Sequence, residues 1–147
     1  RRQRQMCIRD RTVGADVHFL NTGVPHAVAF LDKLEGLDIS RLGAYLRYHE
    51  AFSPKGTNAN FARILSPGHI AIRTYERGVE DETLACGTGI TACALLHAVL
   101  TDAPSPIQVD VAGGDTLKVG FQRTGDRFTD VTLTGPADLV FTGDIQI

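Results

Sequence analysis

The segment Cys86-Gly87-Thr88-Gly89 carries the clearest chemistry in the sequence, because it directly precedes a long apolar run. The first turn of a helix presents N–H groups without intrahelical partners and a partial positive charge. Glycines leave these groups accessible, so a carboxylate can bind there, and the same field favours a thiolate over a thiol. The segment therefore predicts a base beside an anion site. The alternative is that Cys86 is a small buried apolar residue and that the glycines serve packing alone.

A helix expected over residues 85–100 must position this segment. Its run from Ile90 to Leu100 has no polar face, and a helix that is apolar on every side belongs in the interior of a domain. In a small domain rich in strands, the sheet would have to curl around it. Cys93 would lie about 10 Å deeper along the helix axis than Cys86, so we interpret it as a core residue.

Short strands and turns account for most of the remaining chain. Residues 27–34 are compatible with strand or helix, Ser40 is the expected N-cap of a helix over residues 41–48, and residues 53–58 and 78–83 are expected loops. Strands are expected at residues 16–20, 60–65, 69–76, 107–111, 116–122, 128–133 and 139–145. The predicted fold class is α+β, with a mixed, mostly antiparallel β-sheet curled around a central buried helix.

Composition limits the classes of protein that fit the chain. It has 147 residues, of which 43% are hydrophobic, and this is enough for the core of one domain. No apolar run approaches the roughly 20 residues that span a bilayer, so no membrane contact is expected. The three cysteines are odd in number and contain no CxxC pair, which argues against a disulfide framework and a structural zinc site. A reducing, cytoplasmic location is therefore expected.

Residues 1–11 form a basic arm, a feature that often indicates nucleic-acid binding. We interpret them differently, because Arg1 to Asp10 match, in order, one translated frame of a widely used transposase sequencing adapter. A segment encoded by an adapter carries no information about the natural fold, so we take residues 12–147 as the natural domain. Cys7 is then not a candidate for a functional residue. Without residues 1–11 the chain loses five Arg and one Asp, and its net charge changes from −2 to −6. Nucleic-acid binding then has no electrostatic support.

Three blocks in a fixed order resemble the diaminopimelate epimerase family. They are residues 21–26 (NTGVPH), residues 56–61 (GTNANF) and residues 73–89 (RTYERGVEDETLACGTG). The closing hairpins, which end at Gly135-Pro136-Ala137, are also similar to the end of that family. Three ordered blocks are far more specific than any one of them, and the resemblance covers roughly residues 15–147.

The resemblance implies a cofactor-independent epimerase that interconverts LL- and meso-diaminopimelate in lysine and cell-wall precursor synthesis. Family members have two similar domains, each with β-structure curled around a helix, and the active site lies between them. Cys86 would be one of two cysteines that exchange the α-proton, and backbone amides of Gly87 and Thr88 would bind the α-carboxylate. The second cysteine must come from an amino-terminal domain that this chain lacks, so residues 12–147 alone are expected to be inactive. The full enzyme is a possible homodimer.

The resemblance also implies how the distal end of the substrate is bound. Glu76 and Arg77 would engage the distal ammonium and carboxylate, for which the planar guanidinium is well suited. Asn58 would add a hydrogen bond, and His26, together with Glu76, would tune the protonation of the cysteines. Without the resemblance, an exposed charge pair, a turn residue and a structural histidine would be the favoured interpretations of these residues. Val24 occupies the position at which many members carry an Asn that binds the substrate. Val24 cannot make this hydrogen bond, and Asn21 is the candidate to replace it.

Three other interpretations remain open. Proline racemases and phenazine-type isomerases share the two-domain architecture, although the Glu76-Arg77 pair suits a second amino-acid head group and favours diaminopimelate. A non-catalytic β-rich interaction module would have an unreactive Cys86. A cysteine hydrolase would need a base such as His26, but no hydrolase-type signature surrounds Cys86. No pyridoxal phosphate is expected, since none of the lysines, Lys33, Lys55 and Lys118, lies in a motif.

Overall fold

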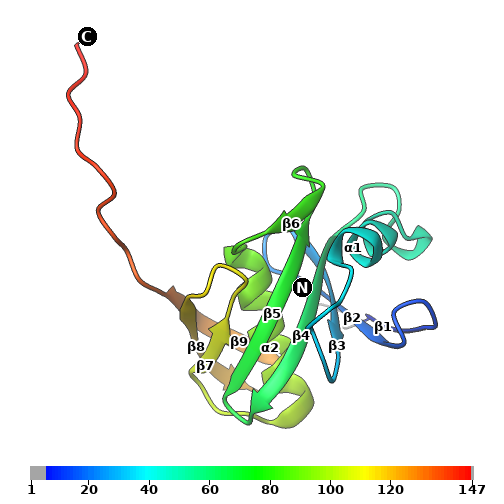
Figure 1. The fold of residues 1–147 in the computed structure, drawn as a ribbon. Helices are drawn as coiled ribbons and strands as arrows, with labels where there is room; N and C mark the ends of the chain where they lie inside the picture. Colours follow the sequence, from blue (N-terminus) through cyan, green and yellow to red (C-terminus); the bar gives the residue numbers. More distant parts are fainter. Residues whose placement is uncertain (1–5, 147) are drawn as a thin grey trace.

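A computed structural model describes residues 6–146 as one mixed sheet with two α-helices (Figure 1). The strands are β1 (Met6–Asp10), β2 (Ala15–Asn21), β3 (Pro25–Phe30), β4 (Asn58–Ser66), β5 (His69–Glu76), β6 (Asp81–Thr83), β7 (Ile107–Asp110), β8 (Thr116–Thr124) and β9 (Arg127–Thr134). The helices are α1 (Ile39–Arg47), the short 3-10 turn η1 (Glu50–Phe52) and α2 (Gly87–Thr101).

The sheet has the order β1-β2-β3-β4-β5-β7-β8-β9, with β6 paired to β5. Strands β3 and β4 are parallel, as are β5 and β7, and the other pairings between described strands are antiparallel. Each parallel pair needs a crossover connection, and these two connections contain α1 and α2. The predicted class, α+β with a mixed and mostly antiparallel sheet, is confirmed.

The sheet separates two apolar cores, because successive strand residues point to opposite faces. Val28 of β3 and Ala62 of β4 pack in one core with Ile90 of α2. Their neighbours Ala29 and Phe61 pack in the other core, which includes the apolar residues of α1. Helix α2 contacts β4 and β5 and lies behind these long strands in Figure 1. Polar residues on the α2 face of the sheet are therefore directed toward this helix.

Helix α2 is buried along most of its length, as its composition predicts. It contacts β2, β3, β4, β5, β7 and β8. It begins at Gly87, with Cys86 as an extended N-cap, and Asp102 follows its end in the left-handed region. Its buried residues are Gly89, Ile90, Ala92, Cys93, Ala94, Leu95, Leu96, His97 and Ala98. No helix within residues 6–146 is both long enough and apolar enough to cross a membrane.

Several predicted boundaries shift by a few residues, and two assignments change. The cap of α1 is Asp38, whose Oδ1 accepts from Arg41 N at 3.0 Å. The prediction of Ser40 was wrong, because Ser40 lies inside the helix and its hydroxyl donates to Asp81 Oδ1. Of residues 27–34, which fitted strand or helix, residues 27–30 belong to β3 and residues 31–34 follow its end. The expected loop over residues 78–83 ends in β6, where three residues pair with β5.

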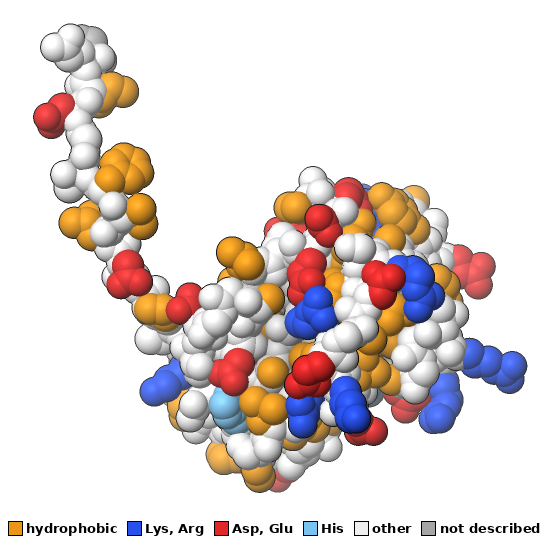
Figure 2. Space-filling model, viewed as in Figure 1, with side chains coloured by type: hydrophobic (Ala, Val, Ile, Leu, Met, Phe, Trp, Pro, Cys, Tyr) orange, Lys and Arg blue, Asp and Glu red, His pale blue; other side chains and the backbone are white. Residues whose placement is uncertain are grey.

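The strand expected over residues 139–145 is absent from the structure, so this prediction was wrong. The segment extends away from the body of the molecule, and Figure 2 shows its apolar side chains in solvent. Leu139, Val140, Phe141 and Ile145 are each more than four-fifths exposed. The alternation of apolar residues is present, but a strand also requires a neighbour to complete its hydrogen bonds, and the described residues provide none.

Part of the head segment is ordered in the structure. Residues 1–5 lie outside the described residues, whereas Met6–Asp10 form β1 at the edge of the sheet, antiparallel to β2. An extended segment of almost any origin can add to an open sheet edge through its backbone groups. The pairing therefore leaves the adapter origin of residues 1–11 a prediction.

Candidate active site

The start of α2 is the structural centre of the candidate site. Cys86 is 9% exposed, and its side chain accepts no hydrogen bond from the first-turn amides, so this N-cap residue leaves them uncapped. The N–H groups of Gly87 and Thr88 have no intrahelical acceptor, as in any first turn. Thr22, in the turn between β2 and β3, donates through its hydroxyl to the Thr88 carbonyl at 2.9 Å. This bond ties the helix start to the β2–β3 turn.

His26 and Thr88 connect this helix start to the sheet. His26 is the second residue of β3 and is fully buried. Its Nε2 lies 2.9 Å from Thr88 Oγ1, which in turn lies 3.6 Å from Cys86 Sγ. Three of the residues predicted to form the site, His26, Cys86 and Thr88, are thus brought together from segments some sixty residues apart in sequence.

Asn60, for which the sequence motifs predict no role, holds the other side of His26. Its Nδ2 lies 3.1 Å from His26 Nδ1 and donates to the Ala27 carbonyl at 3.0 Å, and its Oδ1 accepts from Thr74 at 3.0 Å. The residue is fully buried on the α2 face of β4, opposite Thr74 of β5. A polar residue between the apolar Ala59 and Phe61 was the available signal, since buried polar groups require specific partners. We call His26, Asn60, Thr74, Cys86 and Thr88 the inner cluster.

The environment of His26 keeps its ring neutral. Burial lowers the pKa of His26 from 6.5 to about 4, and the positive charge of Arg77 adds to this effect. Both causes disfavour the imidazolium form. At neutral pH the ring is therefore a hydrogen-bonding group with one N–H rather than a charged acid.

Asn58 and Arg77 meet at the end of β5. Asn58 Oδ1 accepts from the Arg77 backbone N–H at 2.7 Å, and Asn58 Nδ2 donates to the Pro25 carbonyl at 3.2 Å. Asn58 therefore joins β3, β4 and the turn after β5. One hydrogen of its Nδ2 has no partner among these contacts.

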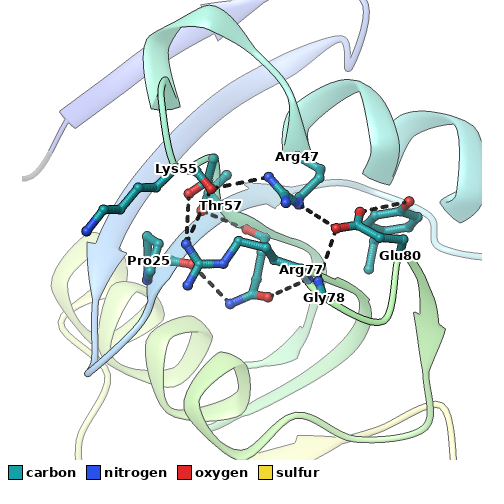
Figure 3. Close-up of polar contacts among 10 residues, drawn as sticks. Pro25, Arg47, Lys55, Thr57, Arg77, Gly78 and Glu80 are labelled. Carbon is teal, nitrogen blue, oxygen red and sulfur yellow. Dashed lines mark hydrogen bonds and ion pairs between the residues drawn. The ribbon is translucent and has the colours of Figure 1, made fainter.

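The Arg77 guanidinium is only loosely held by the protein. Its Nη1 approaches two backbone carbonyls, Lys55 at 3.4 Å and Gly56 at 3.5 Å (Figure 3). Within residues 6–146, no carboxylate lies in ion-pair distance of Arg77. This cation therefore has its planar donor face available for an external anion.

A neighbouring arginine is held far more firmly. Arg47 of α1 pairs with Glu80 at 3.0 Å and donates to the same Lys55 carbonyl at 3.3 Å. Glu80 also accepts from the Gly78 backbone N–H at 3.1 Å, which fixes the turn after β5 (Figure 3). Arg47 thus supports the loop that Arg77 contacts. We call Arg47, Asn58, Glu76, Arg77 and Glu80 the outer cluster.

Glu76 is the member of the outer cluster whose side chain makes no polar contact with the others. It ends β5 and is half-buried, and its carboxylate has no hydrogen-bond or ion-pair partner within residues 6–146. Many family members carry a substrate-binding Asn where this chain has Val24, and Asn21 was the predicted substitute. Asn21 is exposed, and its Oδ1 accepts from the Gly23 N–H at 3.0 Å. The Asn21 side chain therefore helps to shape the β2–β3 turn.

The other cysteines have different surroundings. Cys93 lies on α2 and is fully buried in the core; burial raises the pKa of its thiol, with a smaller contribution from Cys86. Cys7 is exposed on β1. Among residues 6–146, no group of three or more His, Cys, Asp or Glu side chains is arranged to hold a metal ion. The geometry therefore supports a thiol-based proton transfer at Cys86 next to uncapped helix amides.

Comparison with known proteins agrees with the resemblance seen in the sequence. Residues 18–140 match the family model described as diaminopimelate epimerase. The chain is 45% identical over 131 residues to the diaminopimelate epimerase of Chlorobaculum tepidum, covering 88% of this chain and 50% of that protein. It is 47% identical over 124 residues to that of Flavobacterium psychrophilum, covering 84% and 48%. The chain thus spans about half the length of these curated relatives.

Among solved structures, the chain is similar to a protein described as a probable proline racemase from Agrobacterium radiobacter K84, with bound carbonate. The TM-score is 0.56 at 18% sequence identity, over 89% of this chain and 46% of that one. At this identity the likeness concerns the fold alone.

Proposed function

The chain belongs to the diaminopimelate epimerase family, and from that membership we propose that it supplies one half of a cofactor-independent, two-cysteine epimerase active site. The substrate would be diaminopimelate, an intermediate of lysine and cell-wall precursor synthesis in the cytoplasm. The observation that carries the proposal is the arrangement at the start of α2, where Cys86 lies beside uncapped amides and is linked through Thr88 to a buried, neutral His26.

The first turn of α2 would bind the reacting amino-acid head group. The N–H groups of Gly87 and Thr88 point out of the helix start, and the Cys86 side chain does not cap them. An α-carboxylate at this position would also gain from the positive end of the helix dipole. It would thereby place Cα next to the Cys86 sulfur.

Proton exchange at Cα requires one base and one acid on opposite faces of the carbon. The Cys86 thiolate would take the α-proton and become a thiol, leaving a carbanion stabilised by the fixed donors of the helix start. A thiol on the other face would then donate its proton to Cα and become a thiolate. Cys93 cannot be that second group, because it is fully buried within the core. We propose that the second cysteine comes from another domain.

The outer cluster would bind the distal head group. Arg77 has no carboxylate partner within the described residues, and Glu76 has no partner for its carboxylate there. Together they could bind a carboxylate and an ammonium, the two charges of a second amino-acid head group. Asn58 would add its free Nδ2 hydrogen. A substrate with two amino-acid ends fits this pair better than proline does.

A second domain would also complete the fold. We propose that the sheet curls around α2 as the core of one half, and that the open side faces the other half. A hollow of about 880 Å³ lies beside α2, lined by residues that include Thr22, Thr91, Phe128 and Val131. Leu84, two residues before Cys86, is 72% exposed, and the tail residues 139–145 carry four exposed large apolar side chains. Apolar surface of this extent is typical of an interface.

A chimeric protein tests the proposed function. The chain from residue 12 onward would be joined to the amino-terminal half of the Chlorobaculum tepidum relative, of which this chain covers 50%. We expect the chimera to exchange the α-proton of LL-diaminopimelate with deuterium from the solvent, as followed by mass spectrometry. The Cys86→Ala chimera is the matched control and should lose exchange by at least about a thousandfold, as expected for removal of an essential acid–base group.

The unmodified chain of 147 residues serves as the second control. It should show no proton exchange at Cα, because it supplies the acid–base cysteine for only one of the two faces of the carbon. The proposal is overturned if the unmodified chain exchanges the proton at the rate of the relative. It is equally overturned if a folded, monodisperse chimera is inactive under conditions in which the relative is active.

A further inference from the structure

The orientation of the Asn60 amide is fixed by its neighbours. A carbonyl oxygen only accepts hydrogen bonds, so the Asn60 atom 3.0 Å from the Ala27 carbonyl must be Nδ2. The Oδ1 on the other side accepts from the Thr74 hydroxyl at 3.0 Å. Asn60 is fully buried, and a flipped amide would place its oxygen against the carbonyl of Ala27. The Nδ2 group therefore presents a hydrogen to His26.

This orientation selects one tautomer of His26. Nδ1 lies 3.1 Å from Asn60 Nδ2 and must accept its hydrogen, so the ring proton resides on Nε2. A doubly protonated ring would set the Nδ1–H against the Asn60 N–H. Burial and the charge of Arg77 also disfavour that form. His26 is thus held as a neutral ring whose single N–H points away from Asn60.

The chain of donors continues to the sulfur. His26 Nε2–H donates to Thr88 Oγ1 at 2.9 Å, which occupies one lone pair of the hydroxyl. The Thr88 hydrogen can then point to Cys86 Sγ, 3.6 Å away. A thiolate at Cys86 accepts this hydrogen, whereas a thiol donates its own to the second lone pair of Thr88 Oγ1. The hydroxyl can therefore serve both protonation states of Cys86 by rotating, and His26 keeps its proton in both.

The packing around Gly89 holds these groups in register. A Cβ at Gly89 would lie 2.6 Å from Asn60 Oδ1 and 3.3 Å from His26 Cε1. The absence of a side chain thus allows α2 to approach β3 and β4 closely. The bond from Thr22 to the Thr88 carbonyl is a second link between the helix start and the β2–β3 hairpin.

We propose that Asn60 is a positioning residue: it fixes the tautomer of His26, so that His26 and the Thr88 hydroxyl form a directed chain of hydrogen-bond donors ending at Cys86. His26 is then a fixed donor in the reaction and exchanges no proton with Cys86. Thr88 acts on the sulfur through its hydroxyl, in addition to the role of its backbone amide. The hydrogen bonds from Asn60 to Cys86 require no substrate. Only their assignment to epimerisation rests on the proposed function.

The tautomer is measured directly by NMR of the intact chain with ¹⁵N-labelled histidine. We expect His26 to show one protonated Nε2 and one unprotonated Nδ1, unchanged between about pH 6 and about pH 8, around the ordinary titration range of histidine. In the Asn60→Asp variant a carboxylate would accept from Nδ1–H, and the tautomer should invert. A wild-type ring protonated on Nδ1, or a ring that titrates in this range, overturns the proposal whatever the behaviour of the variant.

The hydroxyl link is tested by the alkylation rate of Cys86. Iodoacetamide is used with the Cys7→Ser chain, because Cys7 is exposed, and modification of Cys86 is located by peptide mass spectrometry. Thr88→Val keeps the shape of the side chain and removes the hydroxyl, so the rate should fall by about tenfold, as expected for loss of one hydrogen bond to a charged acceptor. Thr88→Ser should restore it to within about threefold. Equal rates for the Val and Ser variants overturn the proposal.

These measurements separate the two proposals. A correct tautomer and a Thr88-dependent alkylation rate, together with an inactive chimera, would support the chain of donors and reject the proposed function. An active chimera whose His26 carries its proton on Nδ1 would do the reverse.

Discussion

The inner and outer clusters differ in how completely their polar groups are satisfied. In the inner cluster, Asn60 and His26 are fully buried and neutral, and both sides of the His26 ring have a hydrogen-bond partner. In the outer cluster, Arg77 is half-buried and reaches only two backbone carbonyls at 3.4 and 3.5 Å, and Glu76 has no protein partner within residues 6–146. The buried polar side chains of the inner cluster thus have hydrogen-bond partners, whereas the outer cluster presents two charged groups without a partner of opposite charge among the described residues.

The difference separates two tasks. A group that must keep one protonation state throughout a reaction benefits from burial, because every alternative state would leave a donor or acceptor unpaired. A group that must bind an external charge has to keep donors or acceptors free until the ligand arrives. The inner cluster meets the first requirement at His26, and the outer cluster meets the second at Arg77. The comparison predicts that stability depends mainly on the inner cluster.

The largest effect expected is the loss of stability in acid that His26 causes. Unfolded His26 takes up a proton near pH 6.5, whereas burial and Arg77 lower the folded pKa to about 4. The unfolded state therefore binds more protons than the folded state between these pH values. The neutral His26 ring makes its whole contribution to the free energy of unfolding above about pH 6.5. This contribution is lost as the pH decreases toward about 4, by up to about 3 kcal/mol. Urea unfolding at several pH values measures this slope. His26→Gln should make it shallower, and an unchanged slope would contradict the assignment.

A smaller effect is expected from Gly89→Ala, which tests the close contact of α2 with the sheet. The new Cβ would collide with Asn60 Oδ1 and crowd the His26 ring, so the free energy of unfolding should fall by about 2 kcal/mol. Gly87→Ala is the matched control in the same motif. Its Cβ would meet only Leu133 Cδ2, at 3.3 Å, and a change below about 1 kcal/mol is expected. Urea unfolding measures both variants. Equal losses of the free energy of unfolding for Gly89→Ala and Gly87→Ala would refute the close contact of α2 with the sheet at Gly89.

The smallest effect is expected from the two arginines of the outer cluster. Arg47→Gln breaks the ion pair with Glu80, which is partly shielded from solvent, and should reduce stability by up to about 1 kcal/mol. Arg77→Gln removes only two long hydrogen bonds and should leave stability within about 0.5 kcal/mol. In the chimera, however, Arg77→Gln should raise KM for diaminopimelate more than Arg47→Gln does. A larger stability loss for Arg77→Gln would show that this cation is structural.

Much of the fold could be predicted because its signals are local. The apolar run after Gly89 predicted a buried helix, and alternation with turn residues predicted β5 at its observed bounds and most of the hairpins. The family motifs brought Cys86, Thr88 and His26 forward as candidates, and the structure places these three in contact. The strand over residues 139–145 was wrongly predicted, because alternation describes one strand and says nothing about whether a neighbour exists.

The amino-acid sequence specifies which residue types are available: a cysteine before an apolar helix, accessible glycines, and a pair of adjacent opposite charges at residues 76 and 77. Which residues come into contact depends on how strands and helices pack. The register of β3 on β4 and of β4 on β5 places Asn60 between His26 and Thr74. The hydrogen-bonding state of a buried ring depends on partners that are distant in sequence, so it emerges only when strands and helix pack together.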